Sequence, residues 1–127
     1  MSRGSHVLIV ADQPALQELL CWVLQLAGYR TTTCARRQAL LTWIDDMPCG
    51  DCPALILLDL SNPCTNDAAD FLRCLRARWH DACSVPPQVI VLTTSQQVQE
   101  GLEPIERVVL QPFHVRDLIA LMQRVIP

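Results

Sequence analysis

Two uninterrupted apolar runs constrain the fold of this chain more than any other feature of its sequence. Residues 54–58 read Ala-Leu-Ile-Leu-Leu and residues 89–92 read Val-Ile-Val-Leu. A strand with one solvent-exposed face alternates apolar and polar residues, whereas a strand covered on both faces is apolar along nearly all of its length. The two runs therefore predict strands of a parallel sheet that has helices on both sides.

Three further short runs complete a set of five predicted strands: 7–10, 107–110 and, more weakly, 29–34. Four segments carry apolar residues at helical spacing: 14–27, 36–44, 67–79 and 114–125. Strands that alternate with helices indicate an α/β protein with a doubly wound, five-stranded parallel sheet. Residues 94–106, which include Gly101 and Pro104, have room for a turn or two of helix and are expected to be mostly irregular.

Three of the four predicted helices have a stripe of apolar side chains that we expect to be buried. In the first helix, which begins at Pro14 and stops at Gly28, the stripe is Leu16, Leu19, Leu20, Val23 and Leu26. In the third it is Ala68, Phe71, Leu72, Leu75 and Trp79, and in the last Val115, Leu118, Ile119, Met122 and Val125.

Length and charge narrow the function classes. The 127 residues suit one domain spanning 1–127, with half of its residues apolar and 18% charged. The net charge is −3 and basic residues cluster only at Arg36-Arg37 and, more loosely, at 73–78, which predicts no direct nucleic-acid binding by this domain. The chain shows neither a membrane-spanning run nor a secretory signal pattern, so we expect a cytoplasmic protein with no membrane partner.

Seven cysteines are many for such a protein. An odd number without an export signal argues against a disulfide framework, so most are expected to be buried thiols. Cys21, Cys34 and Cys74 lie inside apolar patterns, where cysteine behaves as a small hydrophobic residue.

Polar residues stand where four of the predicted strands end: Asp12, Asp59, Thr93 and Gln111. Ligands of doubly wound sheets bind at the carboxyl ends of the strands, so these side chains are candidates for one site. Two carboxylates suit Mg²⁺, and an aspartate can also accept a phosphoryl group as a nucleophile. The alternative is that both aspartates cap helices or lie in solvent.

These same residues resemble the motifs of the response-regulator receiver domain of two-component systems. Residues 7–13 resemble its first strand and acidic pair, and 57–60 followed by Pro63 resemble the phosphoacceptor strand and loop. Residues 91–94 resemble the switch-threonine strand, and Gln111-Pro112-Phe113 resembles the usual Lys-Pro-Phe. The resemblance covers nearly the whole chain and implies a flavodoxin-like sheet of order 2-1-3-4-5.

The resemblance also implies roles for individual residues. Asp59 would accept a phosphoryl group from a histidine kinase or phosphotransfer protein, and Thr93 would contact a phosphoryl oxygen. Asp12, Asp59 and the backbone carbonyl of Ser61 would bind Mg²⁺. Such a domain is a signalling module rather than an enzyme, and an effector domain could follow residue 127.

Several positions depart from the family pattern. Ala11 replaces the first acid of the pair, which predicts weaker Mg²⁺ binding, and Gln111 replaces the lysine that contacts the phosphoryl group, which removes a charge-assisted contact. Val108 stands where an aromatic switch residue is usual, and the stretch from Thr93 to Gln111 is shorter by about one helical turn. Two interpretations stay open: a working phosphorylation switch, or a degenerate receiver that binds partners independently of phosphorylation.

Enzymes with related folds fit the sequence less well. A flavodoxin-type cofactor site needs a Ser/Thr/Gly-rich loop after the first strand, which 11–15 is not. A dehalogenase-type phosphatase usually has a second acid where this chain has Ser61. The three histidines, His6, His80 and His114, are scattered, and each is expected at the surface or at a helix end.

A second candidate site involves cysteines. Cys49 and Cys52 precede the third strand, and His80 and Cys83 precede the fourth, at the sheet edge opposite Asp59. Three cysteines and a histidine at this spacing could bind Zn²⁺ tetrahedrally. Incidental thiols, or a reversible Cys49–Cys52 disulfide, are the alternatives.

Overall fold

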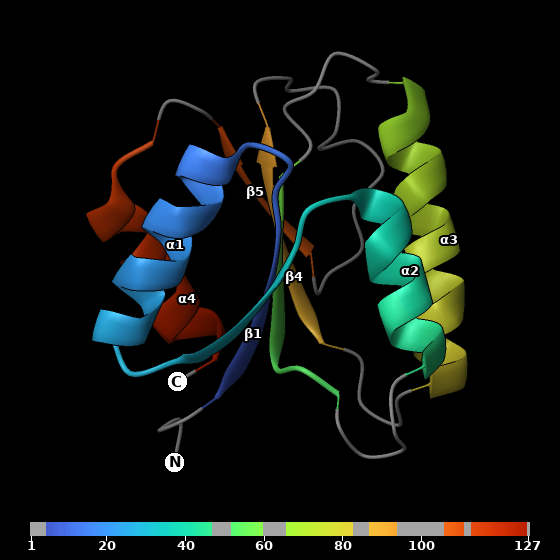
Figure 1. Ribbon diagram of the computed structural model, residues 1–127, viewed down its shortest axis with the longest axis horizontal. Coiled ribbons are helices and arrows are strands. Elements are labelled where there is room, and N and C mark those ends of the chain that lie inside the picture. Colours follow the sequence, from blue (N-terminus) through green and yellow to red (C-terminus); the bar gives the residue numbers. More distant parts are fainter. Residues whose placement is uncertain are drawn as a thin grey trace.

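The computed structural model describes residues 5–46, 52–59, 66–82, 87–93, 106–110 and 113–126. Its five strands form one parallel sheet in the order β2-β1-β3-β4-β5 (Figure 1). The strands are β1 (His6–Val10), β2 (Arg30–Cys34), β3 (Leu55–Asp59), β4 (Gln88–Thr93) and β5 (Glu106–Leu110). The predicted fold class and strand order are both confirmed.

The helices are α1 (Pro14–Leu26), α2 (Arg37–Asp46), α3 (Asn66–Ala82) and α4 (Val115–Val125). Each corresponds to a predicted helical segment. α3 continues past Trp79 through His80 and Asp81, because polar residues interrupt its apolar pattern without ending the helix. The prediction for 94–105 lies outside the described residues, and Glu106 already belongs to β5.

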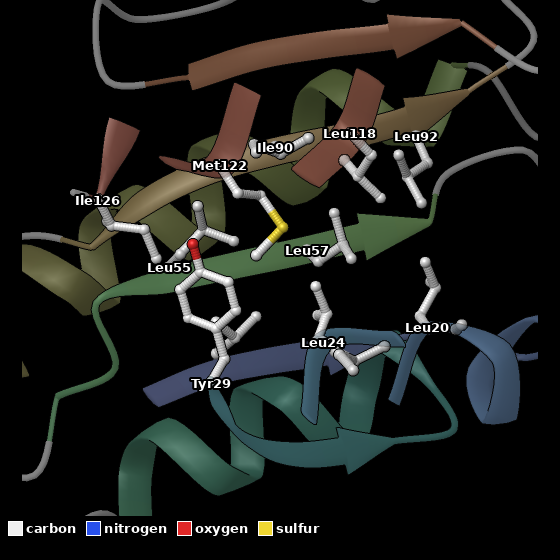
Figure 2. Close-up of a cluster of buried hydrophobic side chains, with 13 residues drawn as sticks. Leu20, Leu24, Tyr29, Leu55, Leu57, Ile90, Leu92, Leu118, Met122 and Ile126 are labelled. Carbon is white, nitrogen blue, oxygen red and sulfur yellow. The ribbon is translucent and has the colours of Figure 1, made fainter. Parts of the chain in front are cut away.

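Helices cover both faces of the sheet, with α1 and α4 on one side and α2 and α3 on the other (Figure 1). Alternate residues of β1 enter two separate core clusters: Leu8 and Val10 face α2 and α3, while Val7 and Ile9 face α1 and α4. Figure 2 shows side chains of the second cluster between the sheet and the two helices. All five residues of β3 are buried, as its continuous apolar run predicts.

The end of α1 is fixed by a Schellman motif. The amide of Tyr29 donates to the carbonyl of Leu24 at 3.0 Å, and the amide of Gly28 donates to that of Gln25 at 3.1 Å. Gly28 adopts φ +99°, a left-handed conformation that glycine takes without strain. Tyr29 and Leu24 also pack in the same core cluster, so the turn directs the chain into β2.

The predicted buried stripe of α1 is partly wrong. The buried residues are Leu20 and Leu24, whereas Leu19 and Leu26 are exposed by 44% and 72%. Most residues of α1 are apolar, so periodicity alone does not decide which face meets the sheet. In α3 and α4 the predicted stripes contain the buried residues, namely Leu72, Leu75, Trp79, Leu118 and Met122.

The expectation of buried thiols holds for Cys34, which is 8% exposed. Cys21 is half-buried, and Cys74 is exposed because it lies off the buried stripe of α3. Cys52 is disulfide-bonded, so it is not one of the thiols, and its partner cysteine lies outside the described residues.

No helix in the described part of the chain is long and apolar enough to cross a membrane.

Candidate functional site

The candidate site lies at the carboxyl edge of the sheet, where β1, β3 and β4 end side by side. Because Val10 pairs with Leu58, the next residue of the first strand, Ala11, is level with Asp59, and Asp12 stands one position beyond it. Asp59 pairs with Leu92, so Thr93 is one residue beyond the carboxylate on the neighbouring strand. The parallel register therefore brings Asp12, Asp59 and Thr93 to one edge, as the sequence predicts.

Asp59 and Thr93 are buried, with 7% and 1% of their surface exposed, whereas Asp12 is exposed. The strand residues that precede Asp59 are fully apolar and buried. Removing a carboxylate from water is costly, and hydrophobic packing of β3 gains nothing from it. Asp12, Asp59 and Thr93 each make at least one polar or electrostatic interaction within the protein. The buried carboxylate of Asp59 therefore contributes little to hydrophobic packing and is a candidate functional group.

Two hydrogen bonds to the backbone of Ala11, the residue before Asp12, hold Asp12 at this edge. The amide of Ala11 donates to the carbonyl of Cys34 at the end of β2, at 3.1 Å. The side-chain amide of Gln17 in α1 donates to the carbonyl of Ala11 at 3.3 Å. Pro14 then begins α1, so the segment carrying Asp12 is anchored both before and after it.

The donor set fits a hard divalent cation. Mg²⁺ binds oxygen ligands and usually keeps several waters, with one or two carboxylates from the protein. Asp59 would supply a buried carboxylate oxygen and Asp12 an exposed one, at adjacent strand ends. Ala11 is 2% exposed and belongs to the same core cluster as Leu20, so this position offers a buried methyl group and no carboxylate oxygen.

Two other predicted site residues, Ser61 and Gln111, lie outside the described residues. Gln111 directly follows β5, whose last residue, Leu110, pairs with Thr93. Val108 pairs with Val91.

The predicted zinc site stays a prediction. Leu55 pairs with Gln88, so β3 and β4 do begin together at the edge opposite Asp59, and His80 is exposed in the last turn of α3. Cys49 and Cys83 lie outside the described residues, and within the described ranges no three potential ligands form a cluster. The disulfide at Cys52 would have to be reduced before that sulfur could bind a metal as thiolate.

Sequence reasoning misses one feature of the surface. Leu19, Trp22 and Leu26 form an exposed apolar stripe on α1, and the helical pattern assigns two of them to the core. The signal is present in the sequence, because a helix that is apolar on most of its circumference has more apolar residues than one core face needs.

One curated protein is similar to this chain in sequence. The chain is 27% identical to the phosphate regulon transcriptional regulatory protein PhoB of Pseudomonas aeruginosa, over 97% of this chain and 52% of that protein. It therefore spans about half the length of this curated relative. No protein-family model matches the chain.

Solved receiver structures share the fold. The response regulator TrrA of Thermotoga maritima, solved in complex with Mg²⁺-BeF, is 21% identical with a TM-score of 0.72, covering 95% of this chain and 98% of that one. The receiver domain of the Francisella response regulator 1452 is 17% identical with a TM-score of 0.74, covering 96% of each chain. The chemotaxis protein CheY4 of Vibrio cholerae is 20% identical with a TM-score of 0.67, covering 96% and 98%. Sheet order and helix placement agree with these structures, and this chain has the CheY-like fold of response-regulator receiver domains.

Proposed function

We propose that this receiver domain accepts a phosphoryl group on Asp59 from a histidine kinase or a phosphotransfer protein. The observation that carries the proposal is the burial of this carboxylate at the end of an otherwise apolar strand, between the strands that lead to Asp12 and Thr93. Receiver domains are signalling modules and generally partner histidine kinases, which agrees with this donor.

In the proposed transfer, a carboxylate oxygen of Asp59 attacks the phosphorus of a phosphohistidine. The new oxygen–phosphorus bond forms as the nitrogen–phosphorus bond breaks, and the electron pair of that bond stays on the imidazole nitrogen. The histidine leaves as neutral imidazole when its other ring nitrogen carries a proton. Such transfers depend mainly on alignment and charge neutralisation, which a bound Mg²⁺ would supply.

The residues of this chain would act mainly by position. Asp12 and Asp59, with the carbonyl of Ser61, would hold the cation. The Thr93 hydroxyl would donate a hydrogen bond to a phosphoryl oxygen. Gln111 can offer a neutral hydrogen bond in place of a lysine contact, which is about half as strong as a charge-assisted bond. We therefore expect Asp59 to be phosphorylated, but phosphorylation to be only weakly coupled to a change in the conformation of the domain.

The second candidate function is a receiver that binds partners without phosphorylation. It is favoured by the burial of the Ala11 methyl group in the core cluster, at a position where the family has a metal-supporting acid. In either proposed function, an effector domain beyond residue 127 would carry the output of this receiver.

Intact mass after incubation with acetyl phosphate and Mg²⁺ tests the main proposal. We expect one phosphoryl adduct on the parent protein and none on Asp59→Asn, because the amide lacks the nucleophilic oxygen pair. Asp117→Asn, which changes an exposed carboxylate on α4, should be labelled like the parent and serves as the matched control. An unlabelled parent, or equal labelling of Asp59→Asn, contradicts the assignment and favours the interaction module.

A further inference from the structure

The large hydrophobic side chains that are exposed in the described part of the chain all lie on the outer face of α1. They are Leu19 (44% exposed), Trp22 (66%) and Leu26 (72%), and exposed Ala15 continues their line towards the start of the helix. At about 100° per residue, these four positions fall within an arc of about 60°, well away from the core residue Leu24. We refer to Ala15, Leu19, Trp22 and Leu26 as the α1 stripe.

The α1 stripe has the spacing of a seam between two packed helices. Its members follow one another at intervals of four, three and four residues, which is the repeat that places apolar side chains on the line where helices meet. The core clusters of the domain include Leu16 and Cys21 of this helix but no member of the stripe. Packing within the described domain therefore does not explain the seam.

The stripe is complementary to a copy of itself. Glu18 is the one charged residue among the thirteen of α1, so this helix offers no charge pattern that would select a strongly charged partner. Intervals of four, three and four residues also read the same in both directions along the helix. A two-fold axis brings the same patch of two subunits together, and a symmetric, nearly uncharged seam satisfies that requirement.

We propose that the α1 stripe is the interface of a reversible homodimer, in which two α1 helices pack antiparallel about a two-fold axis. An axis through the middle of the stripe places Leu19 opposite Trp22 of the second copy, and Ala15 opposite Leu26 of the second copy. The antiparallel orientation opposes the two helix dipoles, whereas a parallel pair would align them and would bring the Glu18 carboxylates of both copies together.

The area of the stripe indicates a weak dimer. The exposed parts of Leu19, Trp22 and Leu26 amount to roughly 400 Å² on each copy, which is comparable to the largest apolar patch of a typical monomer. Two copies would bury roughly 800 Å² of this surface, and flanking polar residues would raise the total to roughly 1,000 Å². That total reaches the lower limit for a specific interface but not the about 1,600 Å² of a standard one. We therefore expect a dissociation constant on the order of tens of micromolar.

The dimer would bring the second copy next to the candidate site. α1 begins at Pro14, two residues after Asp12, so Ala15 lies in the first turn, beside the carboxyl edge of the sheet. The last turn of the second α1, which carries Leu26, would lie opposite this turn. The inference concerns assembly and does not depend on phosphorylation of Asp59.

Sedimentation velocity at protein concentrations from about 5 µM to about 300 µM tests the assembly. A reductant in the buffer excludes dimers linked through the exposed thiol of Cys74. We expect the parent to change from monomer to dimer over this range, and Trp22→Glu to stay monomeric throughout. Ala77→Glu is the matched control, because it places the same charge at an exposed position of α3, which covers the opposite face of the sheet (Figure 1). It should dimerise like the parent, and far-ultraviolet circular dichroism checks the fold of each variant.

A pair of opposite charges tests the antiparallel register. Ala15→Lys and Leu26→Glu should each weaken the dimer at least about fivefold, because each places an unpaired charge against an apolar side chain. Combined in one chain, they should restore the dissociation constant to within about threefold of the parent value. The reason is that the introduced lysine of each copy then lies opposite the introduced glutamate of the other. In a parallel pair the double variant would oppose like charges and would dimerise less than either single variant.

Three results would overturn the inference. A parent that stays monomeric at about 300 µM would show that this face does not bind a second copy. A dimer that persists in Trp22→Glu would place the interface elsewhere on the molecule. A double variant that dimerises no better than Leu26→Glu alone would contradict the antiparallel register.

Discussion

At the scale of single residues, burial separates two of the free cysteines in the described part of the chain. Cys34 ends β2 and is 8% exposed, and burial raises the pKa of its thiol. Cys74 lies on the solvent side of α3. Thiol chemistry proceeds through the thiolate, so both access and pKa protect Cys34.

We expect iodoacetamide at pH 8 to alkylate Cys74 in the native protein at least roughly tenfold faster than Cys34. Peptide mapping by mass spectrometry after timed quenching measures both rates, and urea-unfolded protein gives the reference in which the two should converge. Equal rates in the native state would mean that β2 opens readily and that Cys34 is not a stable part of the core.

At the scale of elements, the turn that ends α1 determines how the chain enters the sheet. Gly28 has φ +99°, and a Cβ added there would have no heavy atom within 4 Å. The cost of a side chain at this position is therefore conformational strain rather than collision. For an L-residue other than glycine the left-handed region costs about 1–2 kcal/mol.

Gly28→Ala should therefore lower the free energy of unfolding by about 1 kcal/mol, measured by urea denaturation monitored by circular dichroism. Gly28→Asn is the informative companion, because asparagine tolerates the left-handed region better, and it should lose less. A Gly28→Ala variant as stable as the parent would contradict the Schellman geometry described for Tyr29 and Leu24.

At the scale of the whole molecule, two core clusters share one sheet, and the candidate metal site lies at the end of the strands that join them. Any ligand that binds only the folded state adds to its stability, by about 1.4 kcal/mol at ten times its Kd. A cation held by Asp12 and Asp59 would therefore be detectable through unfolding of the entire domain.

We expect the thermal unfolding midpoint of the parent to rise when EDTA is replaced by millimolar Mg²⁺. The unfolding midpoint of Asp59→Asn should not respond to Mg²⁺. The midpoint of Asp117→Asn should respond like that of the parent, because this exposed carboxylate, in the first turn of α4, is not one of the proposed ligands. Differential scanning calorimetry at constant ionic strength makes the comparison. An unfolding midpoint of the parent that does not change with Mg²⁺ would contradict the assigned donor set. It would indicate that Ala11, which lacks a carboxylate, leaves the site too weak to bind the cation.

The sequence by itself determined the class of fold and the candidate acceptor. A strand buried on both faces is apolar along nearly all of its length, so the runs at 54–58 and 89–92 predict a parallel sheet covered on both sides. Residues that follow parallel strands must meet at one edge, so the order of the strands and their last residues is enough to group Asp12, Asp59 and Thr93. The order of these residues along the chain, together with the Gln-Pro-Phe motif, indicates the receiver family.

Only the tertiary structure decided which face of α1 is buried and which residues remain accessible. In a mostly apolar helix several faces compete for the core, and packing against the sheet selected Leu20 and Leu24 over Leu19 and Leu26. The tertiary structure also decided the state of two cysteines: Cys74 lies off the buried stripe of α3, and Cys52 is in a disulfide. Local pattern specifies an element and its register in the sheet, but exposure depends on neighbours that are distant along the chain.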